Sequence, residues 1–258
     1  MEHEFIKANY HTHTYRCMHA FGTEREYVEA AVNAGIKILG FSDHVPIRFP
    51  GDYVSGIRMR PDETDDYKKV LSDLRDEFAP QIELHIGFEA EYIPAYFDYH
   101  KSLIDDEGFE YLIMGEHFID EGGPEGIYTG QPTADVDILD KYVKLVIEGA
   151  ATGYFKYVAH PDLINFVGDE TIYRRRMKRM CRELHQMGMP VEINALGYCT
   201  NRHYPSDRFY EIAAEEGVDV IIGMDAHTAW QLVCEESYRG CMDIVDRFGL
   251  HLIEKIDL

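Results

Sequence analysis

The sequence predicts an α/β fold in which parallel strands and crossover helices form a closed or nearly closed barrel. Short apolar runs alternate seven times with amphipathic helical segments, and no linker or change of composition interrupts the alternation. Residue types that bind metals follow most of the apolar runs, as catalytic groups do at the mouth of a βα barrel. Barrels often reach 258 residues as one unit, so we expect a single domain spanning residues 1–258.

The predicted strands are short runs rich in β-branched and aromatic residues, each ending at a polar residue or a turn. They cover residues 5–10, 36–41, 82–88, 111–115, 155–159, 191–193 and 218–223. A long polar loop with several prolines and glycines, residues 46–61, separates the second strand from the next helix. Long loops on compact domains are often functional.

The predicted helices occupy the segments between these strands and carry recognisable end signals. Thr23 and Glu26 form a capping-box pattern at the first helix, which Gly35 ends. Ser206 and Asp207 open a later helix that ends at Gly217. The full set covers residues 23–35, 62–78, 95–106, 134–151, 170–187, 206–217 and 234–248.

Composition limits the partners and the location. The formal net charge of −22 argues against nucleic acid or an anionic membrane, because such binding needs a basic surface. No apolar run is long enough to span a bilayer, and the first residues lack a signal-peptide pattern. The five scattered cysteines predict reduced thiols in a cytoplasmic protein. The sequence does not indicate an oligomeric state.

Histidines and carboxylates gather where the predicted strands end. His11 and His13 alternate along an extended segment, which places both rings on one face. Similar residues follow the later strands: His19 on the first loop, His44, Glu89, His117, His160, Asn194, Asp225 and His227. It is improbable that each of so many imidazoles has its own separate hydrogen-bond partner. Shared cations would provide partners for all of them at once. The nine histidines and carboxylates in this set, without Asn194, exceed one tetrahedral site and predict two or three ions, of zinc, iron or manganese.

One carboxylate is expected to bridge two ions. Glu89 ends a middle strand after an extended apolar run, and Glu91 is the rival for this position. Asp43, Glu116 and Asp162 neighbour the histidines, and we interpret them as outer groups that hold the ligands.

The order of these motifs resembles the PHP (polymerase and histidinol phosphatase) superfamily of metallo-phosphoesterases over nearly the whole chain. The segments Glu192-Ile193-Asn194 and Tyr204-Pro205-Ser206 are similar to its histidinol-phosphatase branch. The resemblance implies a distorted, TIM-like (β/α)7 barrel that binds three metal ions and a role in histidine biosynthesis. It assigns His11, His13, Glu89 and Asp225 to the first ion, Glu89, His117 and His160 to the second, and His19, His44 and His227 to the third.

The implied reaction is hydrolysis of L-histidinol phosphate to L-histidinol and phosphate by a metal-activated hydroxide. We predict catalytic roles for Glu89, Asp225 and His227. Asp162, His203 or metal-bound water would supply the proton for the leaving oxygen.

The substrate-binding residues are less clearly indicated. Members of this branch carry an arginine for the phosphate shortly after the Glu-Ile-Asn element, and here that place holds no arginine. Arg202 lies further along the same loop, and we predict that Arg202, His203 and Asn194 contact the small phosphorylated substrate.

Three alternatives stay open. The first is a phosphatase of the same family that acts on another small phosphomonoester. The second is a metal-dependent nuclease, which the acidic composition disfavours. The third is a metal-storing or ligand-binding barrel without turnover.

Overall fold

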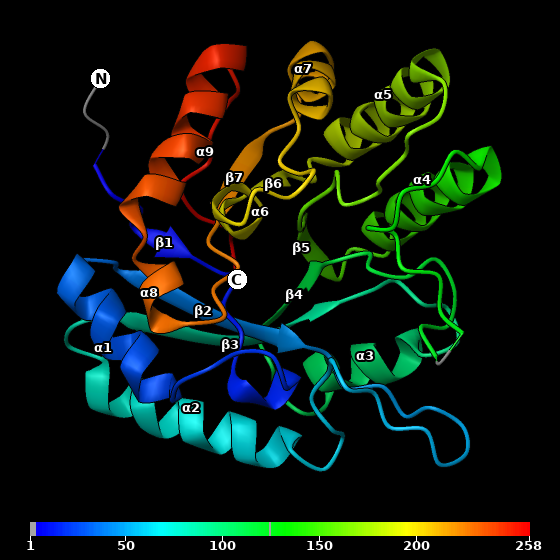
Figure 1. The fold of residues 1–258 in the computed structure, drawn as a ribbon. Helices are drawn as coiled ribbons and strands as arrows, with labels where there is room; N and C mark the ends of the chain where they lie inside the picture. The colour runs from blue at the N-terminus through cyan, green and yellow to red at the C-terminus, as the bar shows by residue number, and fades with distance from the viewer. Residues whose placement is uncertain (1–3, 124) are drawn as a thin grey trace.

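The predicted (β/α)7 barrel is confirmed by the computed structural model, which describes residues 4–123 and 125–258. Within these residues, seven parallel strands lie side by side in chain order, from β1 to β7. The sheet curls around an interior, and the long helices pack outside it (Figure 1). The strands are β1 Ala8–Asn9, β2 Ile38–His44, β3 Glu83–Ala90, β4 Tyr111–Met114, β5 Phe155–Val158, β6 Val191–Asn194 and β7 Val220–Gly223.

All seven predicted helices are present, with ends within three residues of those expected. They are α1 Glu24–Ala34, α2 Thr64–Phe78, α3 Phe97–Asp105, α4 Val136–Ala150, α5 Glu170–Met187, α7 Asp207–Glu216 and α9 Glu235–Phe248. The sequence reading missed three short elements at the mouth: η1 Tyr15–Cys17, α6 Ala195–Cys199 and α8 Ala229–Leu232. Such segments are too short to display a helical period. Among the described residues, no helix has both the length and the apolarity to cross a membrane.

Three strands run further toward the mouth than predicted, and β6 does so by Asn194 alone. β2 includes Ser42–His44 and β3 includes Glu89 and Ala90, and the two strands pair in parallel to their ends. His44 and Glu89 are register partners in this ladder. Regular strand pairing therefore fixes the separation of two of the predicted metal ligands.

The interior of the barrel is filled by side chains, among them three buried tyrosines. Tyr10, Tyr111 and Tyr157 form a cluster with smaller apolar residues of β1, β4, β5 and β7. Tyr111 donates a hydrogen bond to the Tyr10 carbonyl. A Cβ at Gly87 would lie 2.3 Å from the Tyr111 carbonyl oxygen and 2.5 Å from its ring, so glycine makes room for this tyrosine. The filled interior leaves the strand ends as the place for a site.

The barrel closes at its mouth through Asn9. Its Oδ1 accepts a hydrogen bond from Met224 N, which follows β7, and its Nδ2 donates to the His11 carbonyl. Beyond β1, Thr12 bridges Ala226 in parallel, and His13 N donates to the Ala226 carbonyl. The segments that carry His11, His13 and Asp225 are thereby joined.

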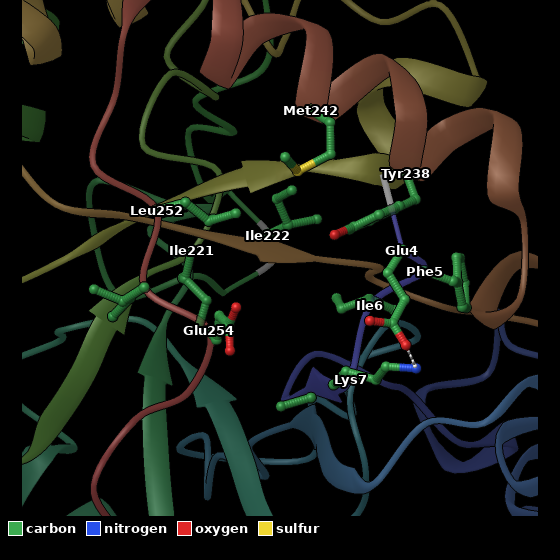
Figure 2. A pocket seen from close by; sticks show the side chains of 12 residues that line it. Glu4, Phe5, Ile6, Lys7, Ile221, Ile222, Tyr238, Met242, Leu252 and Glu254 are labelled. Atoms are coloured by element: carbon green, nitrogen blue, oxygen red, sulfur yellow. Dashed lines mark ion pairs between the residues drawn. The ribbon is translucent and has the colours of Figure 1, made fainter. Parts of the chain in front are cut away.

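At the opposite end of the barrel, the C-terminal tail lies between β1 and β7. The C-terminal tail bonds to β7 through Val220 and Ile253, and Ile256 enters the interior cluster. A cavity of about 220 Å³ remains there, between the chain before β1, β7 and α9 (Figure 2). Its lining is mostly apolar, with an ion pair between Glu4 and Lys7 at the edge. None of the predicted site residues lines it.

The capping box of α1 provides a test of the local prediction. The Thr23 side chain accepts from Glu26 N, and the Glu26 carboxylate accepts from Thr23 N. The T23A variant should therefore lower the free energy of unfolding by about 1 kcal/mol. T171A, which changes an exposed threonine inside α5, is the control. Denaturant unfolding measures both, and equal stabilities for the two variants would contradict the prediction.

Candidate metal centre

The mouth of the barrel brings all nine predicted metal ligands together. They come from the ends of β1, β2, β3, β4, β5 and β7 and from the turn η1. The set is His11, His13, His19, His44, Glu89, His117, His160, Asp225 and His227. Separations of up to 214 residues along the chain are reduced to contact distances, because parallel strands end at one rim.

Four side chains surround a common point at the ends of β1, β3 and β7. His11 Nε2 and His13 Nε2 are 3.1 Å apart, and Asp225 Oδ1 lies 3.4 Å and 3.1 Å from them. Glu89 Oε2 lies 3.5 Å from each of the two nitrogens. Donors on a tetrahedral ion with bonds of 2.0–2.1 Å are separated by about 3.3 Å. The four donors therefore fit one ion.

The second oxygen of Glu89 faces another pair of histidines. Glu89 Oε1 lies 2.8 Å from His160 Nε2 and 3.4 Å from His117 Nε2. A carboxylate with its two oxygens in two separate donor groups has the arrangement of a bridging ligand. Glu91, the rival for this role, lies on the outer side of His117.

A third group of rings lies on the other side of His13. The His19 ring centroid is 5.3 Å from that of His44 and 4.7 Å from that of His227. The Cys17 sulfur lies within 4.8 Å of donor atoms of His19 and His227, a possible donor that the sequence reading did not weigh.

Several buried donor atoms in these groups make no hydrogen bond. Among them are Glu89 Oε2, His160 Nδ1 and His227 Nε2. A buried carboxylate oxygen is costly without a partner, and a bound cation supplies one. The nitrogen and oxygen donors suit zinc, iron or manganese. The residues therefore fit the divalent ions that the resemblance implies.

The outward-facing nitrogens of three of the imidazoles meet buried carboxylates. His11 Nδ1 is 2.7 Å from Glu192 Oε1, His117 Nδ1 is 3.1 Å from Glu91 Oε1, and His13 Nδ1 is 3.4 Å from Asp43 Oδ1. Asp43 also accepts from the backbone and side chain of Thr14. Such carboxylates fix the ring and its tautomer, so that Nε2 is directed into the centre.

The electrostatics of the cluster favour bound cations. Burial opposes charge on His11, but Glu192, Asp225 and Glu89 outweigh it and raise the pKa of His11 well above its usual value. Burial likewise opposes ionisation of Asp225, but the neighbouring histidines, His11 first, lower the pKa of its carboxyl well below the usual range. Burial, assisted by His13, lowers the pKa of His227 to about 3. The ionised Asp225 carboxylate and the neutral His227 are in the protonation states that metal ligands require, and a bound cation would displace the proton that the carboxylates favour on His11.

Two of the predicted ligands have unusual backbone conformations. His160 has φ of 30° and Asp225 has φ of 49°, in the left-handed region that non-glycine residues rarely occupy. Strained conformations of this kind persist where the surrounding structure fixes them, and they concentrate at functional sites.

An open cavity of about 520 Å³ leads to the metal-ligand groups. Besides the ligands, its lining consists of Ile57, Phe118, Tyr128, Leu196, Thr200, Arg202, Tyr204 and Gln231. Arg202 is the only arginine or lysine that lines it among the described residues, and its Nη1 donates to the Tyr204 hydroxyl over 2.6 Å.

The other two predicted substrate contacts do not line this cavity. His203 Nε2 bonds to the Leu163 carbonyl over 2.7 Å. Asn194 is buried, where its Nδ2 donates to Glu192 and Asp225 and its Oδ1 accepts from Gly197 N at the start of α6. Asn194 thus holds two carboxylates of the centre in place.

Sequence reasoning missed the roles of Glu192 and Arg58. Glu192 is fully buried on β6 and, besides His11, accepts from His160 N. A carboxylate inside a run of otherwise apolar strand residues was its only signal. Arg58 is buried against Glu91, and nothing distinguishes it from other loop arginines in the sequence.

Comparisons with known proteins point to the same family as the sequence motifs. The sequence profile of the PHP domain matches residues 9–196. A probable histidinol-phosphatase of Deinococcus radiodurans is 28% identical over 84% of this chain and 85% of its own length. A histidinol-phosphatase of Bacillus subtilis is 22% identical over 86% of this chain and 94% of its own length.

A solved structure has the same fold. It is the histidinol phosphate phosphatase of Lactococcus lactis in complex with zinc, L-histidinol and phosphate. It superposes with a TM-score of 0.71 and 19% identity, covering 98% of this chain and 99% of the other.

Gly115 gives a test of the donor arrangement. A Cβ at this position would lie 1.9 Å from Glu89 Oε1 and 2.8 Å from His117 Cε1. The G115A variant must therefore displace Glu89, and its zinc affinity should fall at least about tenfold. G123A, where a Cβ meets nothing within 4 Å, is the control. Competition with a chromogenic chelator measures the affinity, and parent-like binding by G115A would contradict the arrangement.

Proposed function

The chain belongs to the PHP domain family, and from this premise we propose that it hydrolyses L-histidinol phosphate to L-histidinol and inorganic phosphate. The observation that carries the proposal is the set of nine donors around Glu89, at the base of a cavity that also contains Arg202. The names of the relatives support the choice of substrate.

The proposed cofactor is a cluster of three divalent ions. Zinc is the first choice, because the Lactococcus lactis protein contains it, and iron or manganese suit the same donors. The first ion would be held by His11, His13, Glu89 and Asp225, the second by Glu89, His117 and His160, and the third by His19, His44 and His227. Divalent ions held this way lower the pKa of water and neutralise the charge on phosphate oxygens.

The protein itself positions the reacting groups. Glu89, Asp225 and His227 are the proposed catalytic residues, since they hold the ions against the cavity. Glu192, Asp43 and the other outer carboxylates keep the ligand rings fixed, so that little reorganisation accompanies the reaction.

Arg202 is the proposed phosphate-binding residue. It lines the cavity near Asp225 and His227, and a guanidinium can bind phosphate through two parallel hydrogen bonds. One nitrogen is engaged by Tyr204, which fixes the direction of the side chain. Phe118, Tyr128 and Tyr204 form an aromatic wall for the organic part of the substrate.

The two side chains named as possible proton donors, Asp162 and His203, do not line this cavity. Burial raises the pKa of Asp162 to about 6, but its Oδ2 accepts from Ser206 N outside the cavity lining. His203 bonds to the Leu163 carbonyl. The proton for the leaving oxygen is therefore assigned to a group inside the cavity.

A second candidate is hydrolysis of another small phosphomonoester. The displaced arginine favours it, because Arg202 approaches the cavity from a different place in the loop than the family pattern has. The cytoplasmic location, the role in histidine biosynthesis and the absence of a nucleic-acid partner stay predictions.

A panel of phosphomonoesters tests the proposed function. We expect kcat/KM for L-histidinol phosphate to exceed that for other small phosphomonoesters by about a hundredfold, since pocket contacts discriminate strongly. Metal content is measured on the same preparation.

The D225N variant should lose activity and bound metal together. Equal rates on all esters would reject the substrate, and an active D225N protein with full metal content would reject the assigned role of Asp225.

Arg202 is tested separately from the metal ligands. The R202M variant should keep its metal content, while kcat/KM for the phosphomonoester falls about 10–100-fold through the lost charged hydrogen bonds. R239M, which changes an exposed arginine of α9 paired with Glu235, is the control. Unchanged kinetics of R202M would place the phosphate elsewhere.

A further inference from the structure

A buried ion pair connects the long loop to the candidate metal centre. Arg58 lies in the 46–61 loop, yet it is only 2% exposed. Its Nη1 donates to Glu91 Oε2 over 2.7 Å and its Nη2 to Glu91 Oε1 over 2.5 Å. Two parallel bonds between a guanidinium and a carboxylate form the most directional ion pair available to side chains.

Glu91 passes this constraint to a ligand of the proposed second ion. Glu91 Oε1 lies 3.1 Å from His117 Nδ1, on the far side of the ring from Glu89. The carboxylate is fully buried, so loss of Arg58 would leave its charge without compensation. Therefore Glu91 can fix the orientation of His117 only as long as Arg58 is in place.

The same loop also forms part of the cavity wall. Ile57, the residue before Arg58, lines the cavity and is 42% exposed. The Arg58 guanidinium lies 5.7 Å from the ring centroid of Phe118, another lining residue. Anchoring of Arg58 thus determines where this stretch of the loop meets the cavity.

We propose that Arg58 is a positioning residue that fastens the 46–61 loop to His117 through Glu91, so that metal occupancy at His117 and order in this loop strengthen each other. The coupling is reciprocal, because an anchored loop that favours metal binding must in turn be stabilised by the metal to the same extent. The inference rests on the proposed metal centre, but not on the identity of the phosphomonoester.

Zinc titration of the metal-free full-length chain provides the first test. The H117A variant identifies which zinc equivalent depends on His117. The R58M variant should bind that equivalent at least about tenfold more weakly, as loss of an outer partner does at other sites, and R58K should restore part of the affinity. R60M, which alters an exposed arginine of the same loop, should bind zinc like the parent.

Hydrogen–deuterium exchange of the 46–61 loop provides the second test. Zinc should slow exchange of this loop in the parent and in R60M, and it should have a much smaller effect in R58M. If R58M does not fold, the R58M/E91Q double variant replaces it, because no buried charge is left unpaired. Weakened zinc binding and a loop insensitive to zinc are expected there too.

Parent-like zinc affinity at His117, together with a loop that zinc still protects, in R58M or in the double variant would overturn the proposal. Neither measurement uses phosphatase activity. A chain that binds zinc with this coupling but hydrolyses no phosphomonoester would therefore reject the proposed function and leave the role of Arg58 intact.

Discussion

The structure of the mouth depends on one buried carboxylate, Glu89. Its two oxygens face different sets of imidazoles, with His11, His13 and His44 near one and His117 and His160 near the other. Among the described residues, the oxygen toward His11, His13 and His44 accepts no hydrogen bond, although Glu89 is only 1% exposed. Repulsion between the carboxylates and the cost of burying their charges would drive these side chains apart. The surrounding strands must therefore hold Glu89 in place. Strand β3 does so by pairing with β2 up to the residue that carries this side chain.

The outer carboxylates explain how the flexible imidazole side chains of the predicted ligands are held in one orientation. Three rings are each held by a carboxylate on a different strand or strand end: Glu192 for His11, Asp43 for His13 and Glu91 for His117. Each carboxylate is in turn compensated, by a backbone amide, a hydroxyl, an amide side chain or a guanidinium. The centre is therefore built in successive layers, and it is the outer layer that connects it to the loops.

The inner layer was predictable from sequence, but of the outer layer only Asp43 was, as a neighbour of His44 that contacts His13. The predicted ligands lie at strand ends, so the alternating pattern and the positions of His44, Glu89 and Asp225 predicted both the barrel and the gathering of nine donors. The other outer partners carry no such positional signal. Glu192 is found only by asking why a carboxylate lies within an apolar strand, and Arg58 only through its contact with Glu91. Asn194 was expected at the substrate, but its side chain donates to Glu192 and Asp225, because side-chain direction at a strand end depends on tertiary packing.

The two ends of the barrel differ in how the first and last strands are joined, and the firmer join lies at the end that carries the candidate site. Asn9 and the Thr12–Ala226 bridge join the first and last strands at the mouth, where displacement of a donor by 1 Å would alter the centre. The opposite end tolerates a small cavity and a tail in place of strand pairing. At the mouth, His160 and Asp225 both depart from common backbone conformations. Such conformations persist where the surrounding structure fixes them, and ions that bind only the folded chain would stabilise this arrangement further.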